Sequence, residues 1–278
     1  MSKIRKCLFP VAGFGSRFFP VTKSIPKEML PIITKPLIHY AVEESAQAGL
    51  SSMKIVLSKN KKNIQNYFMI SDNINSASNN NKIKELDLLI QKAEFDYIFQ
   101  SEMLGLGHAI FIARNEIGEE SFAVILPDDL CFNEGKSVIG QMIEIHERYP
   151  DYCIIAIEEV TDDKKSNYGI VSGELFQNHE NLFLVEKMIE KPEADEIDSN
   201  MGIIGRYILT PEIFSKLEST PPDIRGEIQI TNALKKLAKE KKVLAYNFSG
   251  RRFDCGVVEG YIEANNFYLN LYKNTNNN

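Results

Sequence analysis

The stretch FPVAGFGSRFFPVTKSIPKEMLP, residues 9–31, follows the first apolar run of the chain and decides how the rest is interpreted. Its glycines, Gly13 and Gly15, let backbone N–H groups approach phosphate oxygens closely, which a Cβ would obstruct. Cationic side chains that follow can neutralise the phosphate charge that the amides do not reach. These cations are Arg17, Lys23 and Lys27. The stretch therefore predicts a phosphate loop after a first β-strand, suited to an anionic ligand such as a nucleoside triphosphate.

Two familiar phosphate loops do not fit this stretch. A dinucleotide fingerprint, G-x-G-x-x-G, runs straight into a helix, but Phe18 stands here in place of the third glycine and Pro20 follows. A Walker loop requires G-x-x-x-x-G-K-[ST], a string that occurs nowhere in the chain. Because a bare G-x-G is more often a tight turn than a ligand site, the prediction depends on Arg17 and on the P-K-E sequence at 26–28.

Composition narrows the class of protein. The 278 residues are 44% hydrophobic and 25% charged, which is ordinary for a globular chain. A net charge of −6 argues against non-specific nucleic-acid binding, which needs a basic face. No apolar run approaches the roughly 18 residues that span a membrane, and the N-terminus meets Pro10 and Gly13 too soon for a signal peptide. We expect a cytoplasmic protein with no nucleic-acid or membrane partner. The four cysteines and four histidines are scattered, without metal or catalytic-triad spacing.

Strand and helix patterns alternate through the first half of the chain. Apolar runs such as KIRKCLFPV, SMKIVLSK and FAVILP predict strands, with amphipathic helices between them, among them one at 109–116. A repeating β-α-β order predicts a mainly parallel, doubly wound sheet with helices on both faces. Ligands in such sheets bind outside the carboxyl ends of the strands. That rule places Gly13, Gln100 and Asp128 at one edge.

The second half is more mixed and richer in β-strands. YGIVSGELF and LFLVEKMIEKP predict a pair of strands, and a final helix is expected at about 257–272, before a disordered tail at 275–278. Residues 71–81 predict a mobile surface loop or insertion. With no repeat and no clear linker, we expect one α/β domain over 1–274. Its first half would cover about 1–130 and its β-rich half about 131–256.

Two aspartates follow predicted strands and suit a metal ion. Asp128 and Asp254 come from distant parts of the chain, and hard oxygen ligands suit Mg²⁺, which also borrows phosphate oxygens from a substrate. Either residue alone is commonly a turn former, and Asp129 competes with Asp128 for the role. The sequence chemistry leaves that choice open.

Other pairs suit a sugar phosphate and a base. Glu190 and Lys191 offer a carboxylate for sugar hydroxyls and a cation for phosphate, although such a pair in isolation is more often an exposed pair on an edge strand. Gln100, with the glycines of GLG at 105–107, can read a pyrimidine edge, or simply begin a helix. Together these groups indicate nucleotidyl transfer, since a sugar 1-phosphate attacks an α-phosphorus without a general base.

At this point the chain resembles bacterial UTP–glucose-1-phosphate uridylyltransferases, within the nucleoside-diphosphate-sugar pyrophosphorylases. The resemblance implies one domain with a Rossmann-like nucleotide half and a mixed sugar-binding half, and a reaction that makes UDP-glucose and pyrophosphate from UTP and glucose 1-phosphate with Mg²⁺. It also implies a homodimer or homotetramer. The motifs that carry it, in chain order, are residues 9–38, QSEMLGLGHAI, LPDD, NYGIV, IEKP, RGEIQITNAL and FDCG.

The resemblance implies roles at matching positions. Ala12, Gly13 and Gly15 would bind the nucleotide, with Gln100 and Gly105 at the uracil. The catalytic set is Arg17 at the β- and γ-phosphates, Lys27 at the reacting centre, and the Mg²⁺ ligands Asp128 and Asp254, the motif favouring Asp128 over Asp129. The glucose 1-phosphate would be bound by Gly169, Glu190 and Lys191.

Three departures and two alternatives accompany the resemblance. Val11 and Ser16 stand where the family usually has alanine and threonine, and Asn232 replaces a common aspartate. PKEML resembles the uridylyltransferase form, whereas thymidylyltransferases usually show S-K-Q-L-L there. One alternative is therefore a glucose-1-phosphate thymidylyltransferase or another sugar-1-phosphate nucleotidyltransferase. The other is a non-catalytic, nucleotide-sugar-binding regulatory subunit, which would be expected to lack Arg17, Lys27 or a metal ligand.

Overall fold

The apolar run KCLFP forms β1 (Lys6–Pro10), whose three central residues are buried. In this computed structural model, which describes residues 4–70, 81–193 and 196–276, β1 pairs in parallel with β4 and β6. β5 extends this parallel part by pairing with β4. Parallel strands that are apolar on both faces require helices on both sides. The bounds are β4 (Ser52–Leu57), β5 (Glu94–Phe99) and β6 (Phe122–Ile125).

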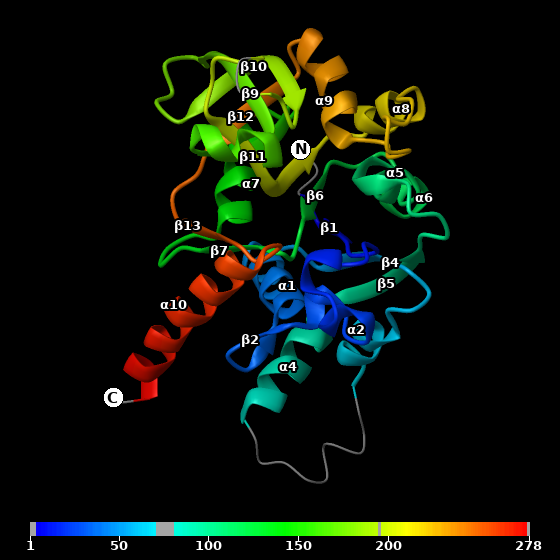
Figure 1. The fold of residues 1–278 in the computed structure, drawn as a ribbon, viewed down its shortest axis with the longest axis vertical. Helices are drawn as coiled ribbons and strands as arrows, with labels where there is room; N and C mark the ends of the chain where they lie inside the picture. Colours follow the sequence, from blue (N-terminus) through cyan, green and yellow to red (C-terminus); the bar gives the residue numbers. More distant parts are fainter. Residues whose placement is uncertain (1–3, 71–80, 194–195, 277–278) are drawn as a thin grey trace.

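The other half of the same sheet is mostly antiparallel (Figure 1). β11 pairs antiparallel with β6 and β8, and β10 with β12 and β9, while β8 and β12 are parallel. Within the described residues the sheet has nine strands, in the order β5-β4-β1-β6-β11-β8-β12-β10-β9. The predicted α/β fold with a mixed sheet is confirmed, but the sheet is not mainly parallel, because four of its eight neighbouring pairings in the described residues are antiparallel and three of the four parallel ones lie in its first half. The bounds are β8 (Cys153–Glu159), β9 (Gly169–Leu175), β10 (Leu182–Glu190), β11 (Met201–Leu209) and β12 (Val243–Asn247).

Two clusters of buried apolar side chains cover opposite faces of this sheet. β1 shows the alternation, because Leu8 belongs to one cluster while Cys7 and Phe9 belong to the other. The first cluster includes helices α5 (Gly105–Phe111), α6 (Arg114–Ile117), α8 (Glu212–Glu218) and α9 (Ile230–Lys239). The second includes α1 (Leu37–Gln47), α2 (Lys62–Tyr67), α4 (Asn81–Gln91) and α7 (Val138–Arg148). None of the helices in the described ranges is long and apolar enough to cross a membrane.

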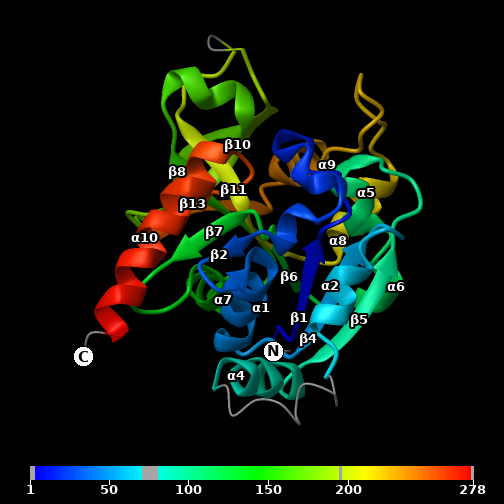
Figure 2. The same cartoon turned by 60° about the horizontal axis from the view of Figure 1, so that its bottom comes forward.

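Two short ribbons and the last helix lie beside the main sheet. β7 (Asp129–Phe132) pairs antiparallel with β13 (Arg251–Asp254), which puts Asp129 opposite Asp254. A third apolar cluster joins Phe253 of β13 to Ala264 of α10 (Val258–Asn276). Both cartoon views show α10 reaching away from the body of the molecule (Figures 1 and 2). The second ribbon consists of β2 (Pro31–Ile32) and β3 (Lys35–Pro36).

Several predicted boundaries change. The expected helix at 109–116 is two helices, because it begins at Gly105 and is interrupted where Ala113 N–H bonds to Ile110 O three residues back. The last helix runs to Asn276, so residues 275 and 276 were wrongly assigned to a disordered tail. No proline or glycine interrupts residues 261–276, which allows the helix to continue.

Two further segments are a helix that was not predicted and a predicted loop. The sequence reasoning missed α7, whose first turn is capped by Ser137 accepting a hydrogen bond from Gly140 N–H at 3.3 Å. The predicted mobile loop at 71–81 lies outside the described residues, except for Asn81, which begins α4.

Candidate active site

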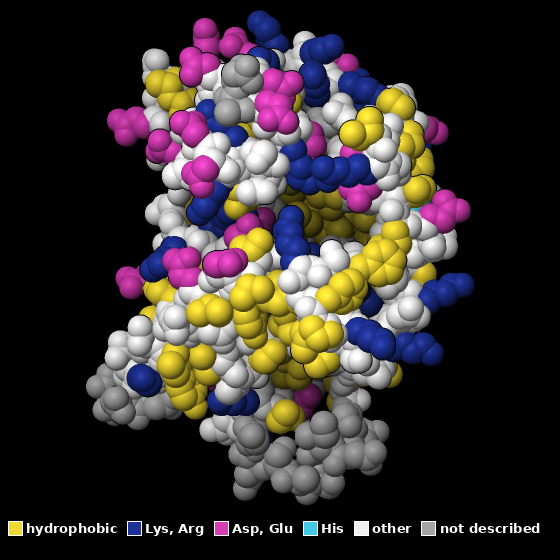
Figure 3. All heavy atoms as spheres, viewed as in Figure 1, with side chains coloured by type: hydrophobic (Ala, Val, Ile, Leu, Met, Phe, Trp, Pro, Cys, Tyr) yellow, Lys and Arg dark blue, Asp and Glu magenta, His cyan; other side chains and the backbone are white. Residues whose placement is uncertain are grey.

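The carboxyl ends of β1, β5 and β6 border a cavity of about 420 Å³. This edge brings together Gly13, Gln100 and Asp128, as the sheet rule predicts. On the face shown in Figure 3, a hollow near the centre has hydrophobic side chains on its floor and Lys or Arg side chains at its edge. The predicted site residues that line the cavity are Ala12, Gly13, Gly15, Lys27, Gln100, Gly105 and Asp128.

The loop after β1 passes through three 3-10 turns instead of a long helix. They are η1 (Ser16–Phe18), η2 (Val21–Lys23) and η3 (Lys27–Met29). Gly15 has φ = 67°, in the left-handed region that favours glycine. A Cβ on Gly15 would lie 3.0 Å from Cβ of Lys27, so glycine allows the loop to close against that lysine. The close approach fixes Lys27 beside the backbone of the phosphate loop.

Gln100 is buried at the base of the cavity. Its Nε2 lies 2.9 Å from His108 Nδ1 and 3.4 Å from Gly105 O, so both contacts hold the amide nitrogen. Burial lowers the pKa of His108, which keeps the ring neutral and able to accept from that amide. This orientation presents the Gln100 carbonyl oxygen as an acceptor, the group needed by a pyrimidine N–H. Gly105, with φ = 87°, could carry no Cβ, because that atom would lie 2.9 Å from Glu227 Cβ.

Lys27 and Asp128 form an ion pair in the wall of the cavity, with Nζ 2.5 Å from Oδ2. Burial lowers the pKa of Lys27, but the charges of Asp128 and Glu28 outweigh it and hold the pKa above the usual lysine value. Burial raises the pKa of Asp128, but the Lys27 charge and hydrogen bond reverse this and leave it below its usual value. Both groups are therefore charged at neutral pH.

The neighbouring Glu28 has a structural role that the sequence did not reveal. It is fully buried and accepts from Lys61 Nζ at 2.7 Å, which ties η3 to the start of α2. Its other oxygen, Oε1, has no hydrogen-bond partner among the described residues. Burial is the main reason that the pKa of Glu28 is raised and that of Lys61 lowered. The buried pair fixes the turn that carries Lys27.

Asp128 and Asp254 meet over Gly256, and this arrangement fits a metal ion. A Cβ built on Gly256 would lie 3.2 Å from Asp128 Oδ2 and 3.0 Å from Asp254 Oδ1. The missing side chain thus leaves a space that two carboxylate oxygens face. No group of three or more His, Cys, Asp or Glu side chains in the described part of the chain could hold a metal. Two carboxylates completed by substrate phosphate oxygens and water are the donor set that Mg²⁺ prefers.

The structure separates Asp128 from Asp129, which the sequence chemistry could not do. Asp129 is buried, and its Oδ2 accepts from Gly205 N–H at 2.6 Å. Its Oδ1 accepts from Arg252 Nε at 2.6 Å. Both oxygens of Asp129 are therefore held by buried protein donors, whereas Asp128 lines the cavity, with Lys27 donating to its Oδ2.

The residues expected at the sugar phosphate also come together. Glu190 Oε2 accepts from Thr231 Oγ1 at 2.6 Å, and a Cβ on Gly169 would lie 3.2 Å from the same oxygen. Lys191 has φ = 47°, which turns it out of the strand alternation, and its Nζ lies 3.6 Å from Glu190 Oε1. A lysine held in this conformation costs about 1 kcal/mol or more. Thr231, through its contact with Glu190, is a candidate site residue that sequence reasoning missed.

Arg17 is not among the residues that line the 420 Å³ cavity with Asp128. Its Nη1 is 3.6 Å from the Cβ position of Gly256, and it lines a separate cavity of about 550 Å³ with Asp254. Tyr168 and Arg252 line the same cavity and hold Asp254. Sequence reasoning did not single out either residue for this task, because each contacts Asp254 through folding and not through a recognisable motif.

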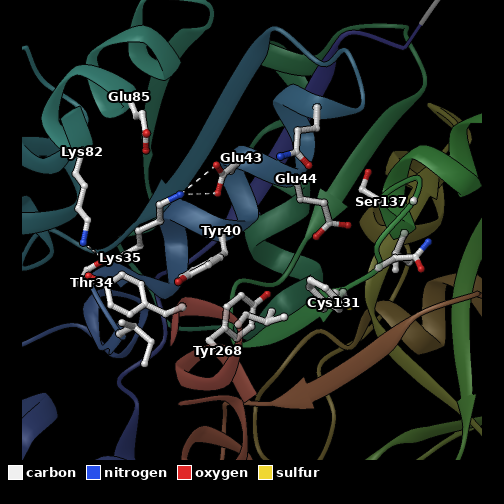
Figure 4. Close-up of a pocket in the computed structure, with 18 residues that line it drawn as sticks. Thr34, Lys35, Tyr40, Glu43, Glu44, Lys82, Glu85, Cys131, Ser137 and Tyr268 are labelled. Atoms are coloured by element: carbon white, nitrogen blue, oxygen red, sulfur yellow. Dashed lines mark hydrogen bonds and ion pairs between the residues drawn. The ribbon is translucent and has the colours of Figure 1, made fainter. Parts of the chain in front are cut away.

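A further cavity, of about 610 Å³, shares no lining residue with the 420 Å³ cavity. Figure 4 shows Lys35 reaching Glu43, with Tyr40 and Tyr268 across the opening. Glu44, at its inner end, pairs with the buried Arg206 at 2.7 Å. None of the site residues predicted from the sequence lines it.

Comparisons with known proteins agree with this geometry. A family model described as nucleotidyl transferase matches residues 10–270. A UTP–glucose-1-phosphate uridylyltransferase from Pseudomonas aeruginosa is 51% identical over 97% of this chain and 98% of its own length. One from Bacillus subtilis is 38% identical over 94% and 90% of the two chains.

A solved structure adds the fold. A UDP-glucose pyrophosphorylase complexed with UDP-glucose superposes with a TM-score of 0.90 and 49% sequence identity, over 96% of this chain and 99% of its own. The match of sequence and fold covers both halves of the sheet and every predicted site residue between 12 and 254. The chain therefore belongs to the nucleotidyl transferase family, as a member of its UTP–glucose-1-phosphate uridylyltransferase group.

Proposed function

We propose that this protein makes UDP-glucose and pyrophosphate from UTP and glucose 1-phosphate. The observation that carries the proposal is the ion pair of Lys27 with Asp128, which faces Asp254 over Gly256. The pair lies in the wall of the 420 Å³ cavity, which we call the nucleotide cavity. A triphosphate in that cavity would present its α-phosphorus to these charges. Relatives of this protein at 51% and 38% identity are named for this activity.

Positioning and charge explain how the residues would work. A sugar 1-phosphate is already an anionic nucleophile near neutral pH, so its attack needs alignment and charge stabilisation more than proton removal. Lys27 keeps its proton, since its pKa lies above the usual value, and it would offset the charge that develops at the α-phosphoryl group. Arg17, which lines a cavity with Asp254, would contact the β- and γ-phosphates that leave as pyrophosphate.

Asp128 and Asp254 would hold Mg²⁺, with the two oxygens that face each other over Gly256 as ligands. When bound, the ion would supply charge to phosphate oxygens in the transition state. Glu190, oriented by Thr231, would accept hydrogen bonds from sugar hydroxyls, and Lys191 would meet the sugar phosphate. The carbonyl oxygen of Gln100 would read the uracil, with Ala12, Gly13, Gly15 and Gly105 around the nucleotide.

Other parts of the proposal rest on sequence reasoning. They are the choice of Mg²⁺ among divalent ions, a cytoplasmic location, a homodimer or homotetramer, and the division into nucleotide and sugar halves near residue 130. The two ends of the mixed sheet support the division, because the nucleotide cavity lies by the parallel strands and Glu190 lies on β10.

Substrate competition tests the base. The enzyme is incubated with equimolar UTP, dTTP and ATP plus glucose 1-phosphate and a divalent ion, and each sugar-nucleotide product is quantified. UDP-glucose should dominate. Equal use of dTTP would reject the uridylyltransferase assignment in favour of a broader nucleotidyltransferase, and absence of any product would favour a regulatory protein.

Substitution of the carboxylates tests the site. Asp128→Ala and Asp254→Ala should each abolish turnover while leaving the circular dichroism spectrum unchanged, because each removes a metal ligand. Asp96→Asn serves as the control, since Asp96, on β5, is half exposed, pairs with Lys54 and lines none of the three cavities. A near-normal rate in either alanine variant would refute the metal role of that residue.

A further inference from the structure

Arg252 is a buried cation surrounded by acidic groups next to the metal pair. Its guanidinium donates to Asp129 from Nε at 2.6 Å and to Glu158 from Nη1, and Nη2 lies 3.5 Å from Asp254 Oδ2. Its side chain is 5% exposed. One guanidinium therefore contacts three carboxylates, and its planar fork fixes the directions from which they approach.

Tyr168 completes the contacts of Arg252 and reaches the same aspartate. Its hydroxyl donates to Asp254 Oδ2 at 2.9 Å and accepts from Arg252 Nη1 at 3.2 Å. The guanidinium carbon lies 5.0 Å from the centre of the tyrosine ring. The tyrosine hydroxyl therefore links the guanidinium of Arg252 to the carboxylate of Asp254.

The two oxygens of Asp254 consequently have different surroundings. Oδ2 is held by Tyr168 and Arg252, whereas Oδ1 accepts only from Gly256 N–H, at 3.1 Å, among the described residues. Oδ1 is also the oxygen that faces Asp128 Oδ2 across the space over Gly256. The side of Asp254 that contacts protein and the side that faces the metal position are thus separated.

We propose that Arg252 and Tyr168 are positioning residues that hold Asp254 Oδ2 so that Oδ1 is presented to the metal ion. This inference rests on the proposed function, because it assigns the space over Gly256 to a divalent cation. Neither residue needs to touch the ion or the reacting phosphate. Arg252 also links Asp254 to β7 through Asp129 and to β8 of the main sheet through Glu158, so the orientation of the ligand is coupled to both.

The positive charge of Arg252 also acts against metal binding. A cation near a metal site repels the metal, so its removal would strengthen metal binding if charge were its main contribution. Removal also frees Asp254 to rotate and leaves three carboxylates close together without a counter-charge. Loss of a fixed ligand geometry weakens binding, typically by 10- to 100-fold for groups that orient metal ligands. Loss of charge repulsion would strengthen metal binding, whereas loss of ligand positioning would weaken it, so the direction of the change in affinity distinguishes the two.

The primary variant is Tyr168→Phe, which removes one hydroxyl and keeps the ring that stacks on Arg252. Arg252→Lys keeps the charge and loses the fork, and Arg252→Met loses both. Arg251→Met is the matched control. Arg251 is adjacent in sequence but half exposed, and it forms its ion pair with Glu263 on α10 and not with Asp254.

Binding of Mn²⁺ to the enzyme–UTP complex, without glucose 1-phosphate, is measured by electron paramagnetic resonance. Turnover as a function of Mg²⁺ concentration and the KM for glucose 1-phosphate are measured in parallel. We expect the Mn²⁺ dissociation constant to rise about 3- to 10-fold in Tyr168→Phe and at least 10-fold in Arg252→Met. Arg252→Lys should lie between Arg252→Met and the wild type, and Arg251→Met should stay within twofold of the wild type. Mg²⁺ saturation should shift in the same order.

Unchanged or tighter Mn²⁺ binding in Tyr168→Phe would overturn the proposal, whether or not Arg252→Met folds. A change confined to the KM for glucose 1-phosphate would do the same, by placing Tyr168 on the sugar instead of the metal ligand. Failure of the proposed function is recognised separately, since the wild-type protein would then give no UDP-glucose in the same assay.

Discussion

The buried pair of Glu44 and Arg206 gives the sharpest prediction about stability. Arg206 is 1% exposed and donates to both oxygens of Glu44, with Nη2 2.7 Å from Oε2. Its Nη1 donates to the carbonyl oxygens of Leu126 and Gly205, and Glu44 also accepts from Ile139 N–H. The pair therefore ties α1 to β11, to α7 and to the segment before Asp128.

Glu44→Gln keeps the size of the side chain and removes its charge. Arg206 would remain a buried cation with only neutral acceptors, and breaking one partner of a buried ion pair costs about 3–5 kcal/mol. We expect a loss of that order in the free energy of unfolding. Glu43→Gln is the matched control, because Glu43 is the next residue on α1 but is about one-third exposed and pairs with Lys35 at the surface. Such a pair contributes about 0–1 kcal/mol.

Urea denaturation followed by circular dichroism measures both variants. A third protein, Glu44→Gln with Arg206→Met, removes both charges and should recover most of the loss, since an apolar replacement of a buried pair is often neutral or stabilising. A loss in Glu44→Gln that is no larger than in Glu43→Gln would refute the reasoning. So would a double variant as unstable as the sum of its single variants.

Three more predictions concern single groups. Gly256→Ala should reduce kcat/KM at least about 100-fold, because its Cβ would fill the space between Asp128 and Asp254, while Gly135→Ala, where a Cβ meets only Asn133 Nδ2 at 3.8 Å, should not. Burial, aided by Lys35, lowers the pKa of His39 to about 4, so the unfolded chain binds a proton between about pH 6.5 and 4 that the folded protein does not. Stability should therefore fall by up to about 3 kcal/mol as pH drops through that window, and His39→Gln should flatten this slope in urea titrations at several pH values; an unchanged slope would contradict it. Burial raises the pKa of Cys131 to about 12, and the other three cysteines are buried, so the folded protein should react with a thiol reagent at pH 8 far more slowly than the unfolded chain, which should titrate four thiols.

The parts of the site that follow directly from strand order were predictable. The rule that parallel strands present their carboxyl ends to one edge brought Gly13, Gln100 and Asp128 together, although they are spread over more than a hundred residues. The glycines of the first loop were equally informative, because the left-handed φ of Gly15 and its contact with Lys27 are properties of the missing Cβ.

Contacts that only folding creates could not be predicted. The chemistry of the residues left Asp128 and Asp129 equivalent, and only the family resemblance favoured Asp128. The physical difference comes from donors on Gly205 and Arg252, which are 76 and 123 residues away from Asp129. The positive φ of Lys191 depends on the end of β10, and no local pattern announces it. Thr231 and Tyr168 are ordinary residues whose roles come from the side chains that they meet. In each case the deciding interaction is long-range, whereas the sequence pattern is local.

The antiparallel ribbon of β7 and β13 has a consequence for the newly made chain. Residue 254 must leave the ribosome before Asp254 can lie opposite Asp129, because β13 is the last strand to be synthesised. Every residue that lines the nucleotide cavity lies at or before Glu227. Asp254, the carboxylate that faces Asp128 over Gly256, is therefore synthesised after every residue that lines the nucleotide cavity, so the proposed metal site is the last part of the candidate site to be assembled during translation.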